Sequence, residues 1–388
     1  MVKRKRIALI FSYNEGWIAG SYYIQNLIHA LNSLPEDEKP ELVILSTILD
    51  FEKVTKLNYP FLSHFNTNIK YTFFQKVINK LARVVTGKNV FEKRPSHTLA
   101  NVFFPMSSED LFELVQDKQR LFWIPDFQEY HLPHFFTQEQ RQNRKSQQEL
   151  LVKQKVPIVF SSNDSLTDFK TFFPEAQNPA FVLPFAVTHE KYHDTDIHTL
   201  KQKYNITKPY YFSPNQFWRH KNHLIVLKAI HRLKEKRDDF QVVFTGKEYD
   251  HRNPTYFEEL KKFIDDNQLQ NYVRFLGFID RKEQLQLMNH SKAVIQPSLF
   301  EGWSTVVEDA KAMNQVVILS DLNVHREQMN YNVVFFDPKN EIDLAQKMEA
   351  VPIRSLDKED DYLNNIKDFG LNFMRIVNKL TSNHEKHI

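Results

Sequence analysis

The chain has 388 residues, which is too long for one hydrophobic core of ordinary size, so we expect two domains. Its 41% hydrophobic and 26% charged residues are typical of a globular protein and exclude a disordered or membrane-embedded one. The net charge of +3 gives no support to nucleic-acid binding, which needs a concentrated basic face.

The chain contains no cysteine, which excludes disulfides, thiolate nucleophiles and cysteine-ligated zinc. A basic N-terminus precedes the apolar run Ile7 to Phe11, which is too short for a signal-peptide core and ends in polar residues. We interpret this run as a first buried strand. No other run is long enough to span a membrane. These features predict a cytoplasmic protein.

Short apolar runs alternate with helical patterns along the whole chain. In the first half we predict strands at 6–13, 41–47, 120–126, 157–163 and 180–186. In the second half we predict strands at 210–216, 241–247, 273–279, 292–298, 315–321 and 333–338. Continuous apolar strands separated by helices indicate parallel sheets with both faces covered.

The polar segment from Thr188 to Pro209 separates the two series of strands. The fold class is therefore α/β, with two doubly wound domains facing each other across a cleft. We expect the domains at 1–188 and 189–360, followed by a closing helix and polar tail at 361–388.

Glycine is rare, with seven residues where the usual frequency of roughly 7% would give many more. Ligands of open α/β sheets bind at the carboxyl ends of the strands, and five of the seven glycines follow predicted strands. We therefore predict a ligand site at Gly16, Gly20, Gly246, Gly277 and Gly302. Neither a G-x-G-x-x-G sequence after the first strand nor a P-loop is present, so no dinucleotide or P-loop site is indicated.

The stretch "PSLFEGWSTVVEDAKAMNQVVILSD" joins a predicted strand to a helix that should begin near Ser304 or Thr305. With Thr305 as N-cap, Glu308 would complete a capping box, which is a purely structural role. Asp309 has no such explanation, and it follows Glu301 by eight residues.

The chemistry of this turn predicts a nucleotide-sugar site. Backbone amides and the positive end of a helix suit a diphosphate, and these would come from Gly302, Trp303, Ser304 and Thr305. Glu301 and Asp309 place a carboxylate on each side, where each can accept hydrogen bonds from sugar hydroxyls.

The longer segment "PSLFEGWSTVVEDAKAMNQVVILSDLNVHREQ" resembles the donor-site signature of the retaining glycosyltransferases of family 4, which have the two-domain, Rossmann-like GT-B fold. Other segments resemble further parts of that family in the same order over most of the chain. They are "NEGWIAGSYYIQNLIHAL", "IPDFQEYHLPHFF", "VFSSNDSLTDF", "YYFSPNQFWRHKNHLIVLKAI", "VVFTGK" and "VRFLGFI".

The resemblance implies roles for single residues. Glu301 would contact the donor sugar, and the turn from Gly302 to Thr305 would bind the diphosphate. Asp309 would hold the nucleotide ribose, although the family has glutamate there. Lys221 would neutralise the leaving diphosphate.

Two further departures from the family pattern bear on these roles. Gln216 stands where the family has a phosphate-binding arginine, so we expect Arg219 to supply that charge from a shifted position. Pro125 replaces the histidine of a His-Asp pair, which leaves Asp126 without its neighbour. Asp126 and His131 are the acceptor-binding candidates; for His131, packing is an equal alternative.

The implied activity is transfer of a sugar from a nucleotide diphosphate sugar to a hydroxyl acceptor during glycan or glycolipid assembly. It would need no metal or other cofactor, because Lys221, Arg219 and the helix amides stabilise the diphosphate. Two alternatives stay open: a sugar-nucleotide-binding partner subunit without transfer activity, and a nucleotide-sugar epimerase of the same fold.

Two other patterns have competing interpretations. Asp194 and Asp196 form an Asp-x-Asp sequence that could bind a metal, although an ordinary solvated loop explains it better. Segment 75–94 is basic and amphipathic, which fits either a packed surface helix or peripheral contact with an anionic membrane at its inner face. Its charged residues are Lys76, Lys80, Arg83, Lys88, Glu92, Lys93 and Arg94.

Overall fold

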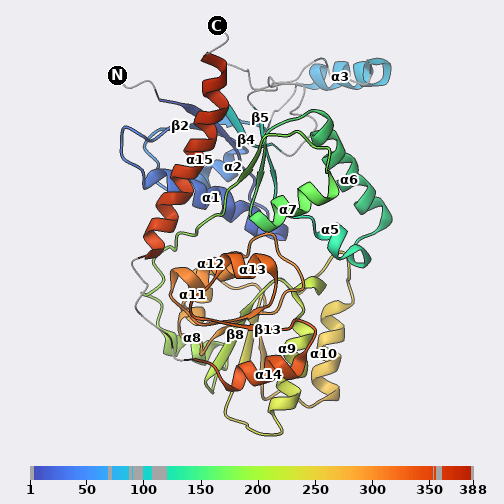
Figure 1. The fold of residues 1–388 in the computed structure, drawn as a ribbon, viewed down its shortest axis with the longest axis vertical. Helices are drawn as coiled ribbons and strands as arrows, with labels where there is room; N and C mark the ends of the chain where they lie inside the picture. The colour runs from blue at the N-terminus through green and yellow to red at the C-terminus, as the bar shows by residue number, and fades with distance from the viewer. Residues whose placement is uncertain are drawn as a thin grey trace.

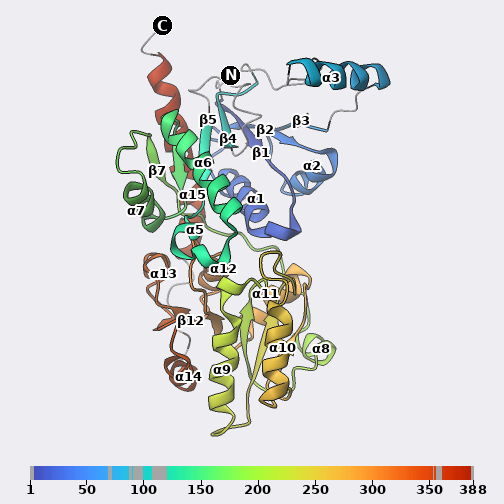
Figure 2. The same ribbon diagram turned by 90° about the vertical axis from the view of Figure 1, so that its right-hand side faces the viewer.

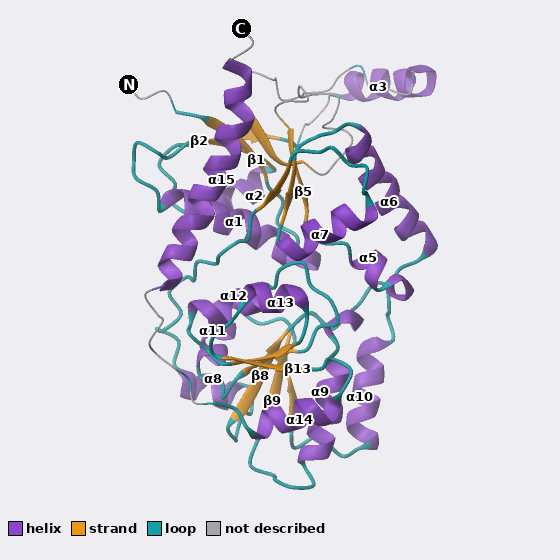
Figure 3. Cartoon of the chain, in the orientation of Figure 1, coloured by secondary structure: helices purple, strands orange, loops and turns teal. Residues whose placement is uncertain are grey.

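The computed structural model describes residues 4–68, 72–86, 90, 99–106, 120–352, 354 and 361–385. Within these ranges the chain forms two parallel sheets, one above the other in Figure 1, each with helices packed on both faces (Figures 1 and 3). The fold class predicted from the sequence, two Rossmann-like α/β domains, is confirmed.

The first sheet has seven strands in the order β3-β2-β1-β4-β5-β6-β7. The strands are β1 (Arg6–Ile10), β2 (Glu41–Ser46), β3 (Leu62–Asn66), β4 (Val102–Met106), β5 (Arg120–Ile124), β6 (Ile158–Phe160) and β7 (Ala180–Val182). The helices around it are η1 (Glu15–Trp17), α1 (Ile18–Asn32), α2 (Ile48–Thr55), α3 (Phe73–Thr86), α5 (Gln128–His131), η3 (Pro133–Phe135), α6 (Gln138–Lys153) and α7 (Asn163–Phe172).

The second sheet has six strands in the order β10-β9-β8-β11-β12-β13. The strands are β8 (Tyr210–Pro214), β9 (Gln241–Thr245), β10 (Val273–Phe275), β11 (Val294–Gln296), β12 (Val317–Ser320) and β13 (Val333–Phe336). The helices are α8 (Ile197–Lys203), η4 (Arg219–Lys221), α9 (His223–Leu233), α10 (Tyr256–Asp266), α11 (Arg281–Asn289), α12 (Thr305–Ala312), α13 (Asn323–Gln328) and α14 (Glu341–Glu349).

Alternating side chains of each strand supply two cores. In β1, Ile7 and Leu9 belong to the core that α1 covers, whereas Ala8 belongs to the core on the opposite face. In β8, Tyr211 and Phe212 divide in the same way between two cores of the second domain. Burial on both faces explains why these strands have continuous apolar sequences.

Eleven predicted strands are confirmed, but β3 and β4 were missed. In β3, the polar residues Ser63, His64 and Asn66 break the apolar run, because this strand lies at the edge of the sheet. β4 lies between β1 and β5 and contains Pro105, which normally argues against a central strand. The register of β4 against β5 shifts between Phe103 and Met106, and this irregularity accommodates the proline.

The last helix, α15 (Asp361–Glu385), returns to the N-terminal domain and lies along α1 (Figures 1 and 2). Gly370 makes this crossing possible, because a Cβ atom there would lie 2.5 Å from the carbonyl oxygen of Ala30. Tyr362, Phe369 and Phe373 are buried in the same core as α1. The two sheets thus lie on either side of the expected boundary at residue 188, while α15 belongs by packing to the first domain.

Helix α3 lies at the edge of the N-terminal domain, beyond the sheet (Figures 1 and 2). It covers the first part of the basic segment 75–94; Lys88, Glu92, Lys93 and Arg94 fall outside the described residues. Within the described ranges, no helix combines the length and apolar character needed to cross a membrane.

Candidate active site

A cavity of about 1000 Å³ lies between the two domains, at the carboxyl ends of both sheets. The loops after β1, β5, β8, β9, β10 and β11 all contribute to its wall. Strand order reverses beside β1 in the first sheet and beside β8 in the second, and ligands of doubly wound sheets bind at such points. This volume is at the upper end of the usual range for ligand pockets.

Helix α12, which follows the turn after β11, begins one residue earlier than the predicted capping box requires. Ser304 is the N-cap, and its hydroxyl accepts a hydrogen bond from the amide of Val307. Glu308 is therefore the fourth helical residue, and the predicted capping box at Thr305 is wrong. The amide of Ser304 donates to the side chain of Gln328 at 3.1 Å, so that amide is already used inside the protein.

Glu308 nevertheless has a structural role, as a buried junction between the domains. Its carboxylate accepts hydrogen bonds from Tyr362 at 2.7 Å and Gln328 at 3.0 Å, and Lys311 lies 3.2 Å away. The hydroxyl of Tyr362 in turn accepts from the amide of Val187 at 2.9 Å. Burial, with the negative charge of Glu308, raises the pKa of Tyr362 well above its ordinary value, so this hydroxyl stays a donor.

Glu301 and Lys221 form an ion pair on the cavity wall. The Nζ of Lys221, which follows β8, lies 2.5 Å from Oε1 of Glu301, which follows β11. The same oxygen accepts hydrogen bonds from Ser298 at 2.6 Å and Gln296 at 2.8 Å. Burial opposes ionisation of Glu301, but the attraction of Lys221 outweighs it and keeps the pKa of Glu301 below its ordinary value. Glu301 is therefore a fixed carboxylate at neutral pH.

Asp309 also lines the cavity, as one partner in a second buried ion pair. Its carboxylate lies 2.5 Å from Arg281 and 3.1 Å from Nε2 of His189. Burial opposes the charge, but Arg281 and His189 lower the pKa of Asp309 below its ordinary value. The acid expected to hold a ribose is thus held in place by Arg281 and His189.

Arg219 does not face the cavity, contrary to the expectation from the sequence. Its guanidinium lies 3.3 Å from Glu259 on the protein surface, and both side chains are exposed. Arg252, after β9, is a basic residue that lines the cavity instead, and it donates to Gln128 of the N-terminal domain at 3.1 Å.

His220, beside Lys221 on the cavity wall, is a neutral ring. Burial, together with the positive charges of Lys221 and Arg252, keeps the pKa of His220 well below its ordinary value. His223 lies behind it, stacked on Phe217 at 4.4 Å, and burial lowers its pKa to about 3. Among the residues that the structure describes, neither histidine is arranged with a third ligand for a metal.

The predicted glycines divide into two groups. Gly16, Gly20, Gly246 and Gly302 line the cavity, whereas Gly277 lies behind Gly246, whose amide donates to the Gly277 carbonyl at 2.9 Å. At Gly302 a Cβ atom would clash with the carbonyl oxygen of Pro125, so the close approach there is to the other domain. At Gly246 it would clash with the carbonyl oxygen of Asn215.

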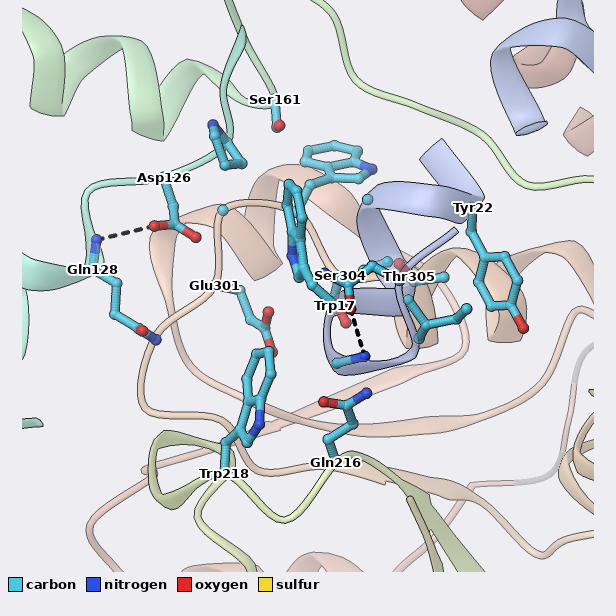
Figure 4. Close-up of a pocket in the computed structure, with 18 of the residues that line it drawn as sticks. Trp17, Tyr22, Asp126, Gln128, Ser161, Gln216, Trp218, Glu301, Ser304 and Thr305 are labelled. Atoms are coloured by element: carbon cyan, nitrogen blue, oxygen red, sulfur yellow. Dashed lines mark hydrogen bonds between the residues drawn. The ribbon is translucent and has the colours of Figure 1, made fainter. Parts of the chain in front are cut away.

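The N-terminal wall contains one of the two acceptor candidates. Asp126 lines the cavity, and its Oδ1 accepts from the amide of Gln128 at 3.2 Å (Figure 4). His131 is not among the lining residues. It pairs with Asp168 at 2.8 Å, which raises the pKa of His131, and it stacks on Phe300 at 4.9 Å. His131 therefore joins the two domains outside the cavity.

The Asp-x-Asp sequence has a structural explanation. Asp196 is the N-cap of α8 and accepts from the amides of His198 and Thr199. Over the part of the chain that the structure describes, no group of three or more His, Cys, Asp or Glu side chains is placed to hold a metal ion.

Sequence reasoning missed several residues of the wall: Trp17, Trp123, Arg144, Trp218, Arg252 and Arg281. One signal was available, because tryptophan is rare and two of these residues, Trp17 and Trp218, lie inside the segments that resemble the family. Their convergence could not be predicted without the fold, because they come from six different strands, loops and helices.

Two facing Rossmann-like domains with the cavity between them define the GT-B class of fold. The family model for glycosyl transferases group 1 matches residues 196–367, which contain the Lys221–Glu301 pair and Asp309. A curated relative, the O-antigen chain mannosyltransferase RfbU of Salmonella typhimurium, is 23% identical over 189 residues. That match covers 49% of this chain and 48% of RfbU, so the matched region spans about half the length of that curated relative.

Solved structures resemble the chain over nearly its full length. A glycosyltransferase from Rickettsia africae has a TM-score of 0.65 at 15% identity, covering 97% of this chain and 99% of that one. Anabaena HepE, in complex with UDP and glucose, has a TM-score of 0.61 at 13% identity and covers 99% of both chains. At these identities the likeness supports the GT-B fold. The similarity to group 1 glycosyltransferases comes from the family model and covers residues 196–367.

The position of Glu308 predicts a loss of stability on substitution. Glu308→Ala removes the acceptor of Tyr362 and Gln328 and the counter-charge of Lys311, and loss of one partner from a buried ion pair costs roughly 3–5 kcal/mol. Urea denaturation should show a lower midpoint at an unchanged slope. Glu258→Ala, at an exposed glutamate of α10, is the control and should change stability by less than about 0.5 kcal/mol. Equal urea midpoints for the two variants would contradict the structural role of Glu308 between the domains.

Proposed function

We propose that this protein is a retaining glycosyltransferase that moves a sugar from a nucleotide diphosphate sugar to a hydroxyl acceptor. The observation that carries the proposal is the buried Lys221–Glu301 pair on the cavity wall, where the loops after β8 and β11 meet. The group 1 match over residues 196–367 and the GT-B fold support it.

The cavity provides a place for each part of the donor. Lys221 and Arg252 are cations beside a leaving diphosphate, and the N-terminus of α12 adds the positive end of a helix dipole. Asp309, held by Arg281, accepts hydrogen bonds from the ribose hydroxyls. Glu301 accepts hydrogen bonds from the hydroxyls of the transferred sugar.

Retention follows in this proposal from attack on the same face of the sugar that the diphosphate leaves. Oε1 of Glu301 already accepts three hydrogen bonds, from Lys221, Ser298 and Gln296, which makes the carboxylate a poor nucleophile. The acceptor hydroxyl therefore attacks the anomeric carbon directly, and its proton passes to the leaving phosphate oxygen. Positive charge from Lys221 and Arg252 replaces a divalent cation in this step.

The setting we propose is the assembly of a glycan or of a lipid-linked saccharide. RfbU is named as an O-antigen chain mannosyltransferase, and HepE was solved with UDP and glucose.

A second candidate function, a sugar-nucleotide-binding subunit without transfer activity, is favoured by Gln216 and Pro125, which replace polar groups of the family pattern. Turnover of a labelled donor separates the two.

We also propose that α3 contacts an anionic membrane surface. Phe73 and Phe74 are 76% and 77% exposed, and Leu81 on the same face is 62% exposed. The polar Asn79 is buried instead, and its side chain accepts a hydrogen bond from the amide of Val90 at 2.9 Å. An apolar outer face beside basic side chains is the pattern of an interfacial helix.

The leaving-group role predicts different effects for two basic residues of the same turn. Lys221→Ala should lower turnover by about a hundredfold or more while weakening donor binding less, because the cation acts mainly on charge that develops in the transition state. Arg219→Ala is the matched control, since Arg219 is paired with Glu259 outside the cavity. Steady-state kinetics with UDP-glucose, UDP-N-acetylglucosamine or GDP-mannose as donor measures both. The mechanism fails if Lys221→Ala stays within a few-fold of the parent.

Metal independence predicts that a chelator leaves activity intact. Turnover after EDTA treatment and gel filtration should stay within about twofold of the untreated protein, because fixed cations stabilise the diphosphate. Added Mg²⁺ or Mn²⁺ should not increase it. A complete loss that either ion restores would reject this proposal and return attention to Asp194 and Asp196.

Membrane contact predicts selective binding to charged vesicles. The parent protein should co-sediment at least about tenfold better with phosphatidylglycerol vesicles than with phosphatidylcholine vesicles. Phe73→Asp/Phe74→Asp should abolish this difference, whereas Leu363→Asp, at a leucine of α15 that is 70% exposed, should keep it. Equal sedimentation with both lipids, or no effect of the α3 variant, would overturn the assignment.

A further inference from the structure

All four tryptophans of the chain line the same cavity. Trp17 and Trp123 come from the N-terminal domain, and Trp218 and Trp303 come from the C-terminal domain. Packing explains Trp303, because its indole N–H donates to the Phe185 carbonyl at 3.1 Å and its ring packs against the N-terminal core. Packing does not explain Trp17, whose surface is 43% exposed.

Trp17 is held at the end of a stack of three rings. Tyr23 is fully buried, and its ring lies 4.1 Å from that of Trp123 at an interplanar angle of 11°. The ring of Trp123 lies 5.7 Å from that of Trp17 at 20°. The indole N–H of Trp123 donates to Ser161 at 2.9 Å, which fixes the middle ring. The outermost ring is thus a rigid apolar surface in the cavity.

The helix beneath Trp17 is shaped to receive it. A Cβ atom at Gly20, in the first turn of α1, would lie 2.6 Å from the ring of Trp17. Glycine lowers the stability of a helix interior by about 1 kcal/mol relative to alanine, so the sequence accepts a weaker helix here. The structure gives Gly20 this packing role, where the sequence had suggested donor binding.

Polar groups border the aromatic surface. Asp126 lies on the same wall. Within the described residues its carboxylate has two polar contacts, a hydrogen bond from the Gln128 amide and an ion pair with Arg144, and both are made through Oδ1. Arg144 reaches the cavity with 46% of its side chain exposed. Figure 4 shows Trp17 and Trp218 entering the pocket from the two domains, with the carboxylate of Glu301 between them in this view.

We propose that Trp17 is the stacking surface for a sugar ring of a saccharide acceptor, with Asp126 accepting hydrogen bonds from that sugar's hydroxyls. A pyranose has one face of C–H groups, which suits the negative face of an indole ring, and hydroxyls at its edge, which suit a carboxylate. This inference rests on the proposed function for the direction of transfer. It defines the acceptor as a saccharide that meets Glu301 and Lys221 from the N-terminal side.

The competing occupant of an aromatic surface is the base of the nucleotide. The geometry favours the saccharide, because the expected ribose partner, Asp309, is grouped with Arg281, which lies over the ring of Tyr22 at 5.2 Å. Trp17 is grouped with Trp123 and Ser161. In Figure 4, Ser161 lies above Trp17 and Tyr22 lies to its right.

Saturation-transfer NMR tests the inference with methyl glycosides of mannose, glucose, galactose and N-acetylglucosamine, each with and without UDP or GDP. Irradiation of aromatic protein protons should transfer saturation to the ring C–H protons of at least one glycoside. Trp17→Ala should weaken that glycoside's binding by about tenfold or more, and Trp17→Phe should restore part of it. The affinity for UDP or GDP, measured by calorimetry, should change by less than about twofold in both variants.

Gly20→Ala provides a second variant that keeps the tryptophan. The added methyl group displaces the ring of Trp17, while alanine favours the helix, so the fold should be retained and glycoside binding should fall as in Trp17→Ala. Circular dichroism and thermal melting check the fold of each variant.

Each outcome decides between the proposals. Nucleotide affinity that falls together with glycoside affinity would assign Trp17 to the donor and overturn the inference. Nucleotide binding without any Trp17-dependent glycoside contact would overturn the inference and leave the proposed function in place. If none of UDP, GDP, ADP and dTDP binds the parent, the proposed function fails, whereas glycoside binding lost in Trp17→Ala would still uphold the saccharide surface.

Discussion

The ion pair between Lys221 and Glu301 is the interaction on which the cavity depends. Two buried charges are costly to desolvate, and they are stable only when hydrogen bonds satisfy them. Here Ser298 and Gln296 complete the shell around one carboxylate oxygen, and the side chain of Asn215 donates to Gln296 at 2.8 Å. These contacts join the loops after β8 and β11, the two strands at which the order of the sheet reverses. One network therefore fixes the cation, the carboxylate and the start of α12 together.

The two domains meet through backbone as well as side chains. Gly302 follows the carboxylate of that network directly, and the carbonyl of Pro125 occupies the space that a side chain would take. Trp303, the next residue, inserts its ring against the core of the N-terminal domain. The turn that holds the candidate donor-binding groups is therefore also the contact surface between the domains. We therefore expect substitutions in this turn to affect domain packing as well as any ligand that it contacts.

The sequence predicted well what depends on local pattern. The strands of the second sheet are continuous apolar runs, because both faces are covered, and all six were found. Lys221 and Glu301 were found because they stand in a motif. Arg219 was misassigned because residues two apart in a 3-10 turn point about 120° away from each other, so Lys221 facing inward directs Arg219 elsewhere. The tryptophan surface depends on contacts between distant segments, which no local pattern encodes.

The path of the chain also determines how the cavity can open. It enters the C-terminal domain after Val187 and returns at Tyr362, and these two crossing points touch, because the Val187 amide donates to the Tyr362 hydroxyl. Two adjacent crossings can act as a hinge, so we expect relative motion of the domains to be a rotation about this point. Helix α5, whose Gln128 accepts a hydrogen bond from Arg252, lies on the opposite side of Figure 1 from the start of α15. Rotation about the crossings would therefore separate Arg252 from Gln128 more than it separates residues near the crossings. Arg252 would then complete the cavity wall only when the two domains are in contact on that side.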